Sequence, residues 1–411
     1  MTVPSLVLFD DLVARRWEPF ALTRPAGELL FGALTLRARA ERVTRLACTC
    51  QLAADHLLGF TEEGAPPVAP LHEAPAEGDR LFWLSRAVPA WETREAMPER
   101  ISRAGPVLVG GEVAGWYAPS GSPPPPREFF DRPVSSDAPV AELPGRLIEH
   151  VWEIISALRD QLSADIAALH PRPRAPNLPE GAHHRGAHPL VLGAGTTIEP
   201  ETVFDTSEGP IWLDDGVEVQ AFTRLGGPAY VGRDSRLLGG ALDCVAIGPV
   251  CRVHGQVGES VCLGYTNKQH DGHLGHAYLG RWVNLGAETT NSDLKNNYGT
   301  VRLWTPEGEA DTGEVKMGCL LGDHVKTGIG LLINTGTVVG AGSNLFGAGL
   351  PPKYVPPFSW GSGADLTEFR LDKFLEVAER AMERRGVTLT AALRDQLTRA
   401  WRRGRVAPGT W

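Results

Sequence analysis

Aliphatic residues recur at every sixth position in the second half of the chain. The longest unbroken run consists of Leu213, Val219, Leu225, Val231 and Leu237, and a small or polar residue usually follows each. Three six-residue edges would close one triangular coil, with the aliphatic side chain of each edge inside and glycine, asparagine or aspartate at the tight corners. Ordinary β-strands would instead repeat their inward residues every two positions. The pattern therefore predicts a parallel β-helix with a continuous aliphatic core.

The six-residue period returns further along the chain. Leu279 and Leu285 follow it, and from Leu321 it continues through LGDHVK, TGIGLL, INTGTV, VGAGSN and LFGAGL, where only Thr327 breaks the aliphatic column. We predict a β-helix domain over residues 189–350.

The remaining patterns predict three further regions. Residues 1–141 mix apolar runs such as LVLF and LFWL with the helical pattern LTLRARAERVTRL, which indicates an α/β domain. Residues 142–188 form a linker, with one long helix over 142–170 followed by a proline-rich connector. Residues 351–411 form a tail that becomes helical from about Leu366. Its apolar stripe would cap the last coil or contact a neighbouring subunit.

Charge and composition exclude some classes of function. The formal net charge of −9 without a long basic run argues against nucleic acid as a partner. No apolar stretch approaches the roughly 20 residues that span a bilayer, and the amino-terminal MTVPSLVLFDDL is more typical of a strand than of a signal peptide. The six cysteines show no CxxC spacing, so we expect neither disulfides nor a structural zinc site. We therefore expect a cytoplasmic protein with no membrane association.

Candidate chemistry gathers where the six-residue period is interrupted, in YTNKQHDGHLGHA and in TNSDLKNNYGTVRLWTPEGEADTGE. The first interruption holds His270, His273 and His276 within seven positions. Loops that leave a rigid scaffold often carry function. From the residues alone, the histidines could form a metal site, supply a catalytic base with supporting imidazoles, or belong to a polar loop.

The stretch NKQHDGHLGHAYLGRWVNLGAETTNSDLKNNYGTVRLW, residues 267–304, resembles the acetyltransferase site of the left-handed β-helix sugar-phosphate enzymes. The family is that of the bifunctional glucosamine-1-phosphate N-acetyltransferases and N-acetylglucosamine-1-phosphate uridylyltransferases. The opening LFDD…LTRPAGELLFGALT and the tail PPFSWG resemble a variant sugar nucleotidyltransferase branch of it. The resemblance implies a nucleotidyltransferase-like α/β domain, a left-handed parallel β-helix and a helical tail. It also implies a homotrimer that binds acyl-CoA between adjacent prisms and contributes to UDP-N-acetylglucosamine synthesis.

The resemblance also assigns site residues. Aligning VNLGAET with the family's V-N-I-G-A-G-T places His270 on the catalytic histidine and Asn284 on a sugar-contacting asparagine, whereas Glu288 replaces a glycine. Further substrate-binding candidates are His273 and His276, which stand where the family has tyrosine and aspartate, and Asn297 and Tyr298, which match an Asn-Tyr pair.

The chemistry of amide formation agrees with a histidine at position 270. A sugar amine arrives largely as an ammonium ion, and imidazole can remove its proton at neutral pH. Acetyl-CoA would be the co-substrate, and the backbone N–H groups of Gly286 and Ala287 could stabilise the oxyanion. Arg252 and Lys268 are candidates for holding the sugar phosphate.

The amino-terminal region lacks the glycine-rich phosphate loop of ordinary sugar nucleotidyltransferases. In its place, the resemblance suggests Arg15 and Arg24 for the nucleotide phosphates and Asp10 or Asp11 for Mg²⁺, if this domain is active. The alternative is a degenerate domain kept for packing or substrate capture.

Two other classes of function stay open. A zinc-dependent hydratase of the γ-carbonic-anhydrase kind also uses a β-helix and three histidines, although no carboxylate or cysteine completes a familiar zinc pattern here. A non-catalytic scaffold that binds a nucleotide sugar is the other alternative. The sequence names neither the sugar nor the acyl group.

Overall fold

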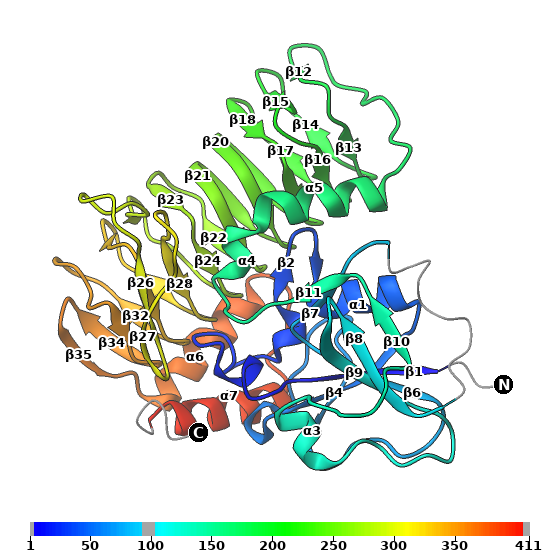
Figure 1. Ribbon diagram of the computed structural model, residues 1–411. Helices are drawn as coiled ribbons and strands as arrows, with labels where there is room; N and C mark the ends of the chain where they lie inside the picture. Colours follow the sequence, from blue (N-terminus) through cyan, green and yellow to red (C-terminus); the bar gives the residue numbers. More distant parts are fainter. Residues whose placement is uncertain (1–3, 93–102, 406–411) are drawn as a thin grey trace. The chain divides into compact units, whose positions relative to one another are not determined.

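The computed structural model describes residues 4–92 and 103–405 and divides the chain into two compact units (Figure 1). The first unit contains the chain up to Leu29, Leu34–Glu153 and Thr390–Arg403. The second contains Leu30–Ala33, Ile154–Leu389 and the chain from Gly404. The units are therefore not the linear succession of regions that the sequence pattern suggests, because each includes segments far apart in the chain.

The first unit is an α/β domain built on a seven-stranded mixed sheet, as predicted. Its strand order is β10 (Ala141–Leu143), β8 (Gly105–Val109), β9 (Glu112–Ala118), β6 (Arg80–Leu84), β1 (Ser5–Phe9), β4 (Cys48–Ala53) and β5 (Val68–Pro70). The central strand β1 pairs in parallel with β4 and β6, and β9 runs antiparallel to both of its neighbours. The apolar runs LVLF and LFWL are thus the buried centre of this sheet.

Shorter elements complete the first unit. They are the helices α1 (Leu36–Thr44), α3 (Arg127–Asp131) and most of α7 (Ala391–Gly404), the 3₁₀ turns Ala14–Arg16, Ala26–Glu28 and Asp55–Leu57, and the strands β3 (Leu34–Thr35), β7 (Ala87–Pro89) and β11 (Gly145–Leu147). Helix α1 begins where the Thr35 hydroxyl accepts a hydrogen bond from the N–H of Ala38 (3.1 Å), because a threonine at this position satisfies one of the free N–H groups of the first turn.

The second unit is a left-handed parallel β-helix, which confirms the fold predicted from the six-residue period. Its coils have three faces. The first face consists of β12 (His183–Arg185), β15 (Val203–Asp205), β18 (Thr223–Gly226), residues 240–243 of β20 (Arg236–Ile247), 255–258 of β21 (Arg252–Cys262), β23 (His273–Gly275), β25 (Thr290–Asn291) and β30 (Leu332–Ile333).

The second and third faces follow in chain order. The second face consists of β13 (Leu190–Leu192), β16 (Ile211–Leu213), β19 (Ala229–Val231), 245–247, 260–262, β24 (Tyr278–Leu279), β28 (Cys319–Leu321), β31 (Thr337–Val339) and β33 (Tyr354–Val355). The third face consists of β14 (Thr197–Ile198), β17 (Glu218–Val219), 236–237, 252–253, β22 (Asn267–Lys268), Asn284, β29 (Lys326–Thr327), β32 (Asn344–Leu345) and β34 (Ser359–Ser362), with β35 (Asp365–Glu368) antiparallel to β34.

The predicted aliphatic column forms the core of this prism. All five members of the run from Leu213 to Leu237 are at most 1% exposed. The interruption at Thr327 also has a partner inside the prism, because its hydroxyl lies 2.8 Å from that of Thr289 and accepts a hydrogen bond from the Gly286 N–H. A buried hydroxyl is tolerated when it is hydrogen-bonded.

The β-helix extends beyond both predicted bounds, 189 and 350. It starts at β12, where His184 takes the place in the register that Phe204 and Leu225 occupy in the next coils. It continues to β34, where Gly361 is in register with Leu345. Since neither His184 nor Gly361 is aliphatic, the six-residue pattern could not reveal these end coils.

The predicted long helix over 142–170 is shorter in the structure. Its first part forms strands β10 and β11, and helices α4 (Glu153–Ser156) and α5 (Leu158–Leu169) follow. Gly145, the first residue of β11, has φ +143°, and a Cβ there would lie 2.4 Å from the Val88 carbonyl oxygen, so this position favours glycine over a helix former.

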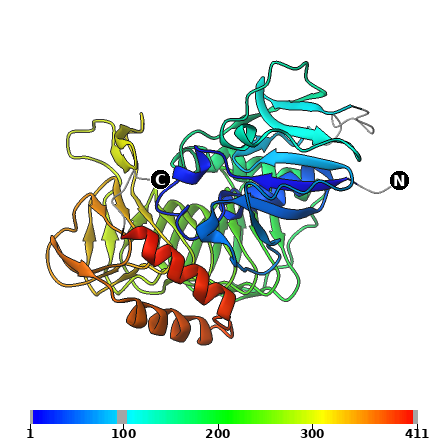
Figure 2. The ribbon, with the colours of Figure 1, turned by 90° about the horizontal axis from the view of Figure 1, so that it is seen from below.

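Two further segments complete the second unit. The tail forms β35 where a helix was expected, and helix α6 (Leu371–Glu383) begins five residues after Leu366 and lies alongside the coils (Figure 2). The short segment Leu30–Ala33, which includes β2 (Leu30–Phe31), binds to the β-helix through the Leu30 N–H, which donates to the Tyr278 hydroxyl (2.8 Å). A hairpin of β26 (Arg302–Thr305) and β27 (Gly308–Asp311) lies in the insertion between β25 and β28.

The described residues contain no helix that is both long and apolar enough to cross a membrane. The six cysteines are free thiols.

Candidate active site

The three histidines of HDGHLGH lie along one edge of a coil rather than in a cluster. His270 is in the corner between the third and first faces, and its side chain is exposed. His273 is on the first face, in β23. His276 occupies the next corner, between the first and second faces, with φ +45°. A repeat of six residues places the two end histidines at successive corners, so only one of them can serve a given cleft.

The His270 corner is held from inside the prism by Lys268. The register aligns Lys268 with the inward residue Val253, and its side chain is buried. Its ammonium group donates hydrogen bonds to the carbonyl oxygens of His254 (2.9 Å) and His270 (2.5 Å). Burial lowers the pKa of Lys268. The ammonium group therefore connects two successive corners and fixes the backbone that presents His270.

The sequence predicts that Lys268 holds the sugar phosphate, whereas the structure gives its ammonium group two carbonyl partners inside the prism. An ammonium group inside the prism with two carbonyl acceptors cannot reach a ligand on the surface. Gly286 needs a similar correction, because its N–H already donates to the Thr327 carbonyl (3.1 Å) and hydroxyl (3.0 Å) and is not available for an oxyanion. The Ala287 N–H finds no acceptor among the residues that the structure describes, so only Ala287 keeps the predicted role.

A second histidine lies beside His270 in the corner stack. The Nδ1 of His254 is 2.7 Å from the Leu238 carbonyl oxygen, and its Nε2 is 3.0 Å from Asp271 Oδ1. The two contacts fix the orientation of the His254 ring between the Leu238 carbonyl and the Asp271 carboxylate. Sequence reasoning missed His254, although it precedes His270 by sixteen residues, about one coil.

His276 belongs to a network of charged side chains at its own corner. Its Nδ1 is 2.8 Å from Asp293 Oδ2, and its Nε2 contacts Glu259. Arg159 of α5 lies 3.2 Å from the other oxygen of Glu259, and His273 Nε2 is 3.9 Å from Asp293. Both ring nitrogens of His276 thus have carboxylate partners, which leaves His276 a structural role in place of the predicted contact with substrate.

The pKa values of this network follow from its geometry. Burial alone would lower the pKa of His276, but the hydrogen bonds to Asp293 and Glu259 raise it to about 9. The same contact with His276 lowers the pKa of Glu259 to about 2, and His273 and His276 hold the pKa of Asp293 well below its usual range. His276 is therefore an imidazolium at neutral pH and does not accept a proton there.

Asn284 is on the third face, where its Oδ1 accepts a hydrogen bond from Asn267 Nδ2 (2.8 Å). It lines a 360 Å³ cavity together with Gln269, the residue before His270. Asn284 therefore has access to a cavity beside the His270 corner. Arg252 is also on this face, in register with Asn267.

The predicted Asn-Tyr pair lies elsewhere. Asn297 lines a 530 Å³ cavity of the insertion with Trp304 and Lys353, and neither His270 nor Asn284 contributes to its lining. Tyr298 is 71% exposed. The structure does not bring this pair to the His270 corner within one chain.

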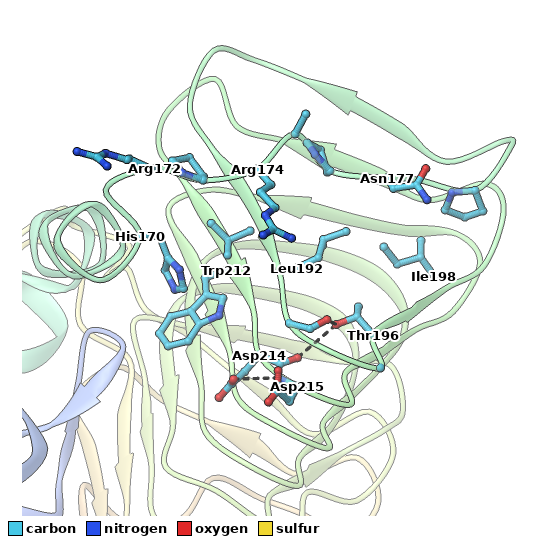
Figure 3. A pocket seen from close by; sticks show the side chains of 17 residues that line it. His170, Arg172, Arg174, Asn177, Leu192, Thr196, Ile198, Trp212, Asp214 and Asp215 are labelled. Carbon is cyan, nitrogen blue, oxygen red and sulfur yellow. Dashed lines mark hydrogen bonds between the residues drawn. The ribbon is translucent and has the colours of Figure 1, made fainter.

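Another cavity, of 590 Å³, lies at the first coils, between the proline-rich connector and the second face (Figure 3). Arg174 points into it over Leu192, and Trp212 forms one wall with His170, whose ring centroid is 4.6 Å away. None of the site residues expected from the sequence lines it.

In the first unit, the predicted phosphate and metal residues have partners from the protein itself. Arg15 contacts Asp131, and Arg24 Nη2 lies 2.9 Å from Glu62 Oε1. Arg86 binds both oxygens of Asp11, at 3.1 and 3.0 Å from its Nε. The structure thus gives Arg86 a role that the sequence did not assign.

The fit of Mg²⁺ to this region is poor. Asp10 Oδ2 accepts a hydrogen bond from the Ala26 N–H (3.1 Å), and burial raises the pKa of Asp10 to about 6. With Asp11 bound to Arg86, the pair offers few free charged oxygens, which are what Mg²⁺ requires. Across residues 4–92 and 103–405, no group of three or more His, Cys, Asp or Glu side chains is arranged to hold a metal ion.

The fold and the corner site define a left-handed β-helix protein with an α/β domain in front. Residues 6–172, from within β1 to just beyond α5, match the family model of sugar nucleotidyl transferases. A search of curated proteins found no match.

Two solved structures are similar to part of the chain. One is a Bacillus cereus protein described as an acetyltransferase, with 14% identity, a TM-score of 0.27 and coverage of 54% of this chain and 99% of the other. The second is the Arabidopsis UDP-N-acetylglucosamine acyltransferase, with 12% identity, a TM-score of 0.29 and coverage of 53% and 87%. These identities are too low to transfer an activity.

Proposed function

We propose that the protein is an acyl-CoA-dependent N-acyltransferase that acts on a hexosamine 1-phosphate. The observation that carries the proposal is the exposed His270 at a corner that Lys268 fixes from inside the prism. Such rigid presentation suits a general base, whose contribution depends on its position. The resemblance of residues 267–304 to an acetyltransferase site and the sugar nucleotidyl transferase match of residues 6–172 support a sugar substrate.

The proposed reaction forms one amide and breaks one thioester. His270 takes a proton from the sugar ammonium, and the amine nitrogen then attacks the thioester carbonyl carbon. In the proposed reaction, the Ala287 N–H donates a hydrogen bond to the developing oxyanion. As the C–S bond breaks, the attacking nitrogen loses its second proton and the leaving thiolate takes up that proton, which gives free CoA and the N-acyl sugar. Asn284 contacts the sugar from the neighbouring third face. The site as proposed lies between adjacent prisms of a homotrimer.

We propose that nucleotidylyl transfer in the first unit follows acylation: the phosphate of the N-acylhexosamine 1-phosphate attacks the α-phosphate of UTP, pyrophosphate leaves, and the product is a UDP-N-acetylhexosamine. The family match of residues 6–172 supports this second activity. The ion pair between Arg86 and Asp11 and the ion pair between Arg24 and Glu62 would have to open to receive a nucleotide. This activity belongs in the cytoplasm, where nucleotide sugars are made.

A thiol-release assay with acetyl-CoA and glucosamine 1-phosphate tests the acyl transfer. Since a positioned general base contributes about 100- to 10,000-fold, we expect His270→Ala to lower kcat/KM by that factor. The matched control is His188→Ala, which removes an exposed histidine from an early coil of the same β-helix. Equal rates for the two variants would refute the role of His270.

A further inference from the structure

The 360 Å³ cavity on the third face lies between the β-helix and the carboxyl-terminal end of α6. The residues that line it include Tyr265, Trp282, Asn284, Lys326, Arg384 and Arg385. Its volume is within the range of small-molecule sites and too small for a polymer. Apart from Asn284, the sequence pattern marked none of these residues as functional.

Positive charge is concentrated in this cavity. Arg380, Arg384 and Arg385 come from the last turn and end of α6, and Lys326 comes from β29 on the coils. Arg380 pairs with Glu376 of its own helix. Within the described part of the chain, no carboxylate lies at ion-pair distance from Lys326, Arg384 or Arg385. Three cationic side chains therefore reach the cavity without a protein counter-charge.

The charges next to the cavity have the same sign. Burial, together with the nearby charges of Arg385 and Arg236, lowers the pKa of Arg252. Of these, Arg236 bonds to Glu218 at 2.8 Å. Like charges gathered in one place are unfavourable unless an anion neutralises them, and here they gather in a protein whose formal net charge is −9.

Amide groups and aromatic rings line the same cavity. Because the Asn284 oxygen accepts from Asn267 (2.8 Å), its amide NH₂ is left to donate elsewhere. The Lys326 ammonium donates to the Trp282 carbonyl oxygen, which places its charge at the cavity wall. The rings of Trp282 and Tyr265 stack with centroids 4.2 Å apart and form a flat apolar side. Cations, amide donors and stacked rings that line one cavity suit a phosphorylated organic molecule.

We propose that this cavity binds the phosphate group of a small phosphorylated metabolite, with Arg384, Arg385 and Lys326 as its cationic ligands. The inference rests on the proposed function because it names the place where a phosphate of the reactants binds. Binding of an anion in this cavity does not itself require acyl transfer. The phosphate comes from one of two sources, the sugar 1-phosphate or the phosphorylated nucleoside end of acyl-CoA.

Isothermal titration calorimetry of the full chain tests the proposal with two probes, glucosamine 1-phosphate and adenosine 3′,5′-bisphosphate. The test variant is Arg384→Gln/Arg385→Gln. Loss of two charge-assisted hydrogen bonds should weaken binding at least about 10-fold. The control, Arg172→Gln/Arg174→Gln, removes the same number of exposed arginine charges from the connector and should bind like the wild type. The single variant Arg384→Gln changes only an exposed side chain, so it still tests binding if the double variant fails to fold.

The two probes distinguish the sugar 1-phosphate from acyl-CoA as the source of the bound phosphate. The binding and thiol-release assays together distinguish phosphate binding from acyl transfer. Tight binding of the sugar phosphate alone assigns the cavity to the sugar, and tight binding of the bisphosphate alone assigns it to acyl-CoA. If the wild type binds either probe but transfers no acyl group in the thiol-release assay, the proposed function is refuted and this inference stays intact. If the wild type binds neither probe, or the test and control variants bind equally, the inference is wrong.

Discussion

The corner of the coil at which a residue lies decides which side chains it contacts. His270 and His276 are six positions apart in a repeat of six, yet one is exposed and the other is held by two carboxylates. The motif in the sequence predicts a catalytic role for His270. The sequence could have identified the partners of His276, since Glu259 and Asp293 each lie 17 residues from it, which is the length of about one coil. The stack of coils, rather than local spacing, brings them together.

The His276 network predicts a stability that depends on pH. The folded-state pKa of His276 is raised from 6.5 to about 9, so its contribution is fully present below pH 6.5 and is lost as pH rises to about 9. We expect His276→Gln to lower the melting temperature at pH 6 by the equivalent of about 2 kcal/mol and to differ little from the wild type at pH 9.5. Thermal melting followed by circular dichroism across this range, with His188→Gln as the control, checks this. A loss of melting temperature in His276→Gln that grows with pH would contradict the stabilising role of the charged His276.

The strands of the β-helix follow from one repeated pattern of six residues. Predictions from the sequence differ from the structure where a coil departs from that repeat. The step on the third face is 16 residues from Arg236 to Arg252 and 15 from Arg252 to Asn267, as their register shows, rather than 18. Since β22 has only two residues, alternation could not tell which of Asn267 and Lys268 points inward. Lys268 was therefore assigned to substrate although it is in the core.

The aliphatic column predicts how mutations affect the β-helix. Leu225 is fully buried in the core, so Leu225→Ala should destabilise the protein by about 2–5 kcal/mol through lost burial and a cavity. Leu332→Ala removes the same atoms from a side chain that is 55% exposed on the same face and should cost far less. Thermal melting of both variants measures the difference. Equal losses would mean that the column does not stabilise the coils as described.

At the scale of the whole molecule, the sequence predicted both folds but not which segments form each unit. Leu30–Ala33 belongs to the β-helix unit and Thr390–Arg403 to the α/β unit, and no local pattern signals such long-range membership. The same holds for the cationic cavity, because α6 and the third face meet only through the tertiary fold. Its arginines look like an ordinary solvated helix end in the sequence.

The central claim is that the β-helix presents His270 for acyl transfer to a sugar amine, and the identity of the product tests it most directly. The purified protein would be incubated with acetyl-CoA and glucosamine 1-phosphate, and the products would be identified by mass spectrometry and nuclear magnetic resonance. We predict N-acetylglucosamine 1-phosphate, acetylated on nitrogen, with one free CoA thiol for each molecule formed and almost no product with His270→Ala. Absence of any acetylated sugar, or a yield that His270→Ala leaves unchanged, would contradict it.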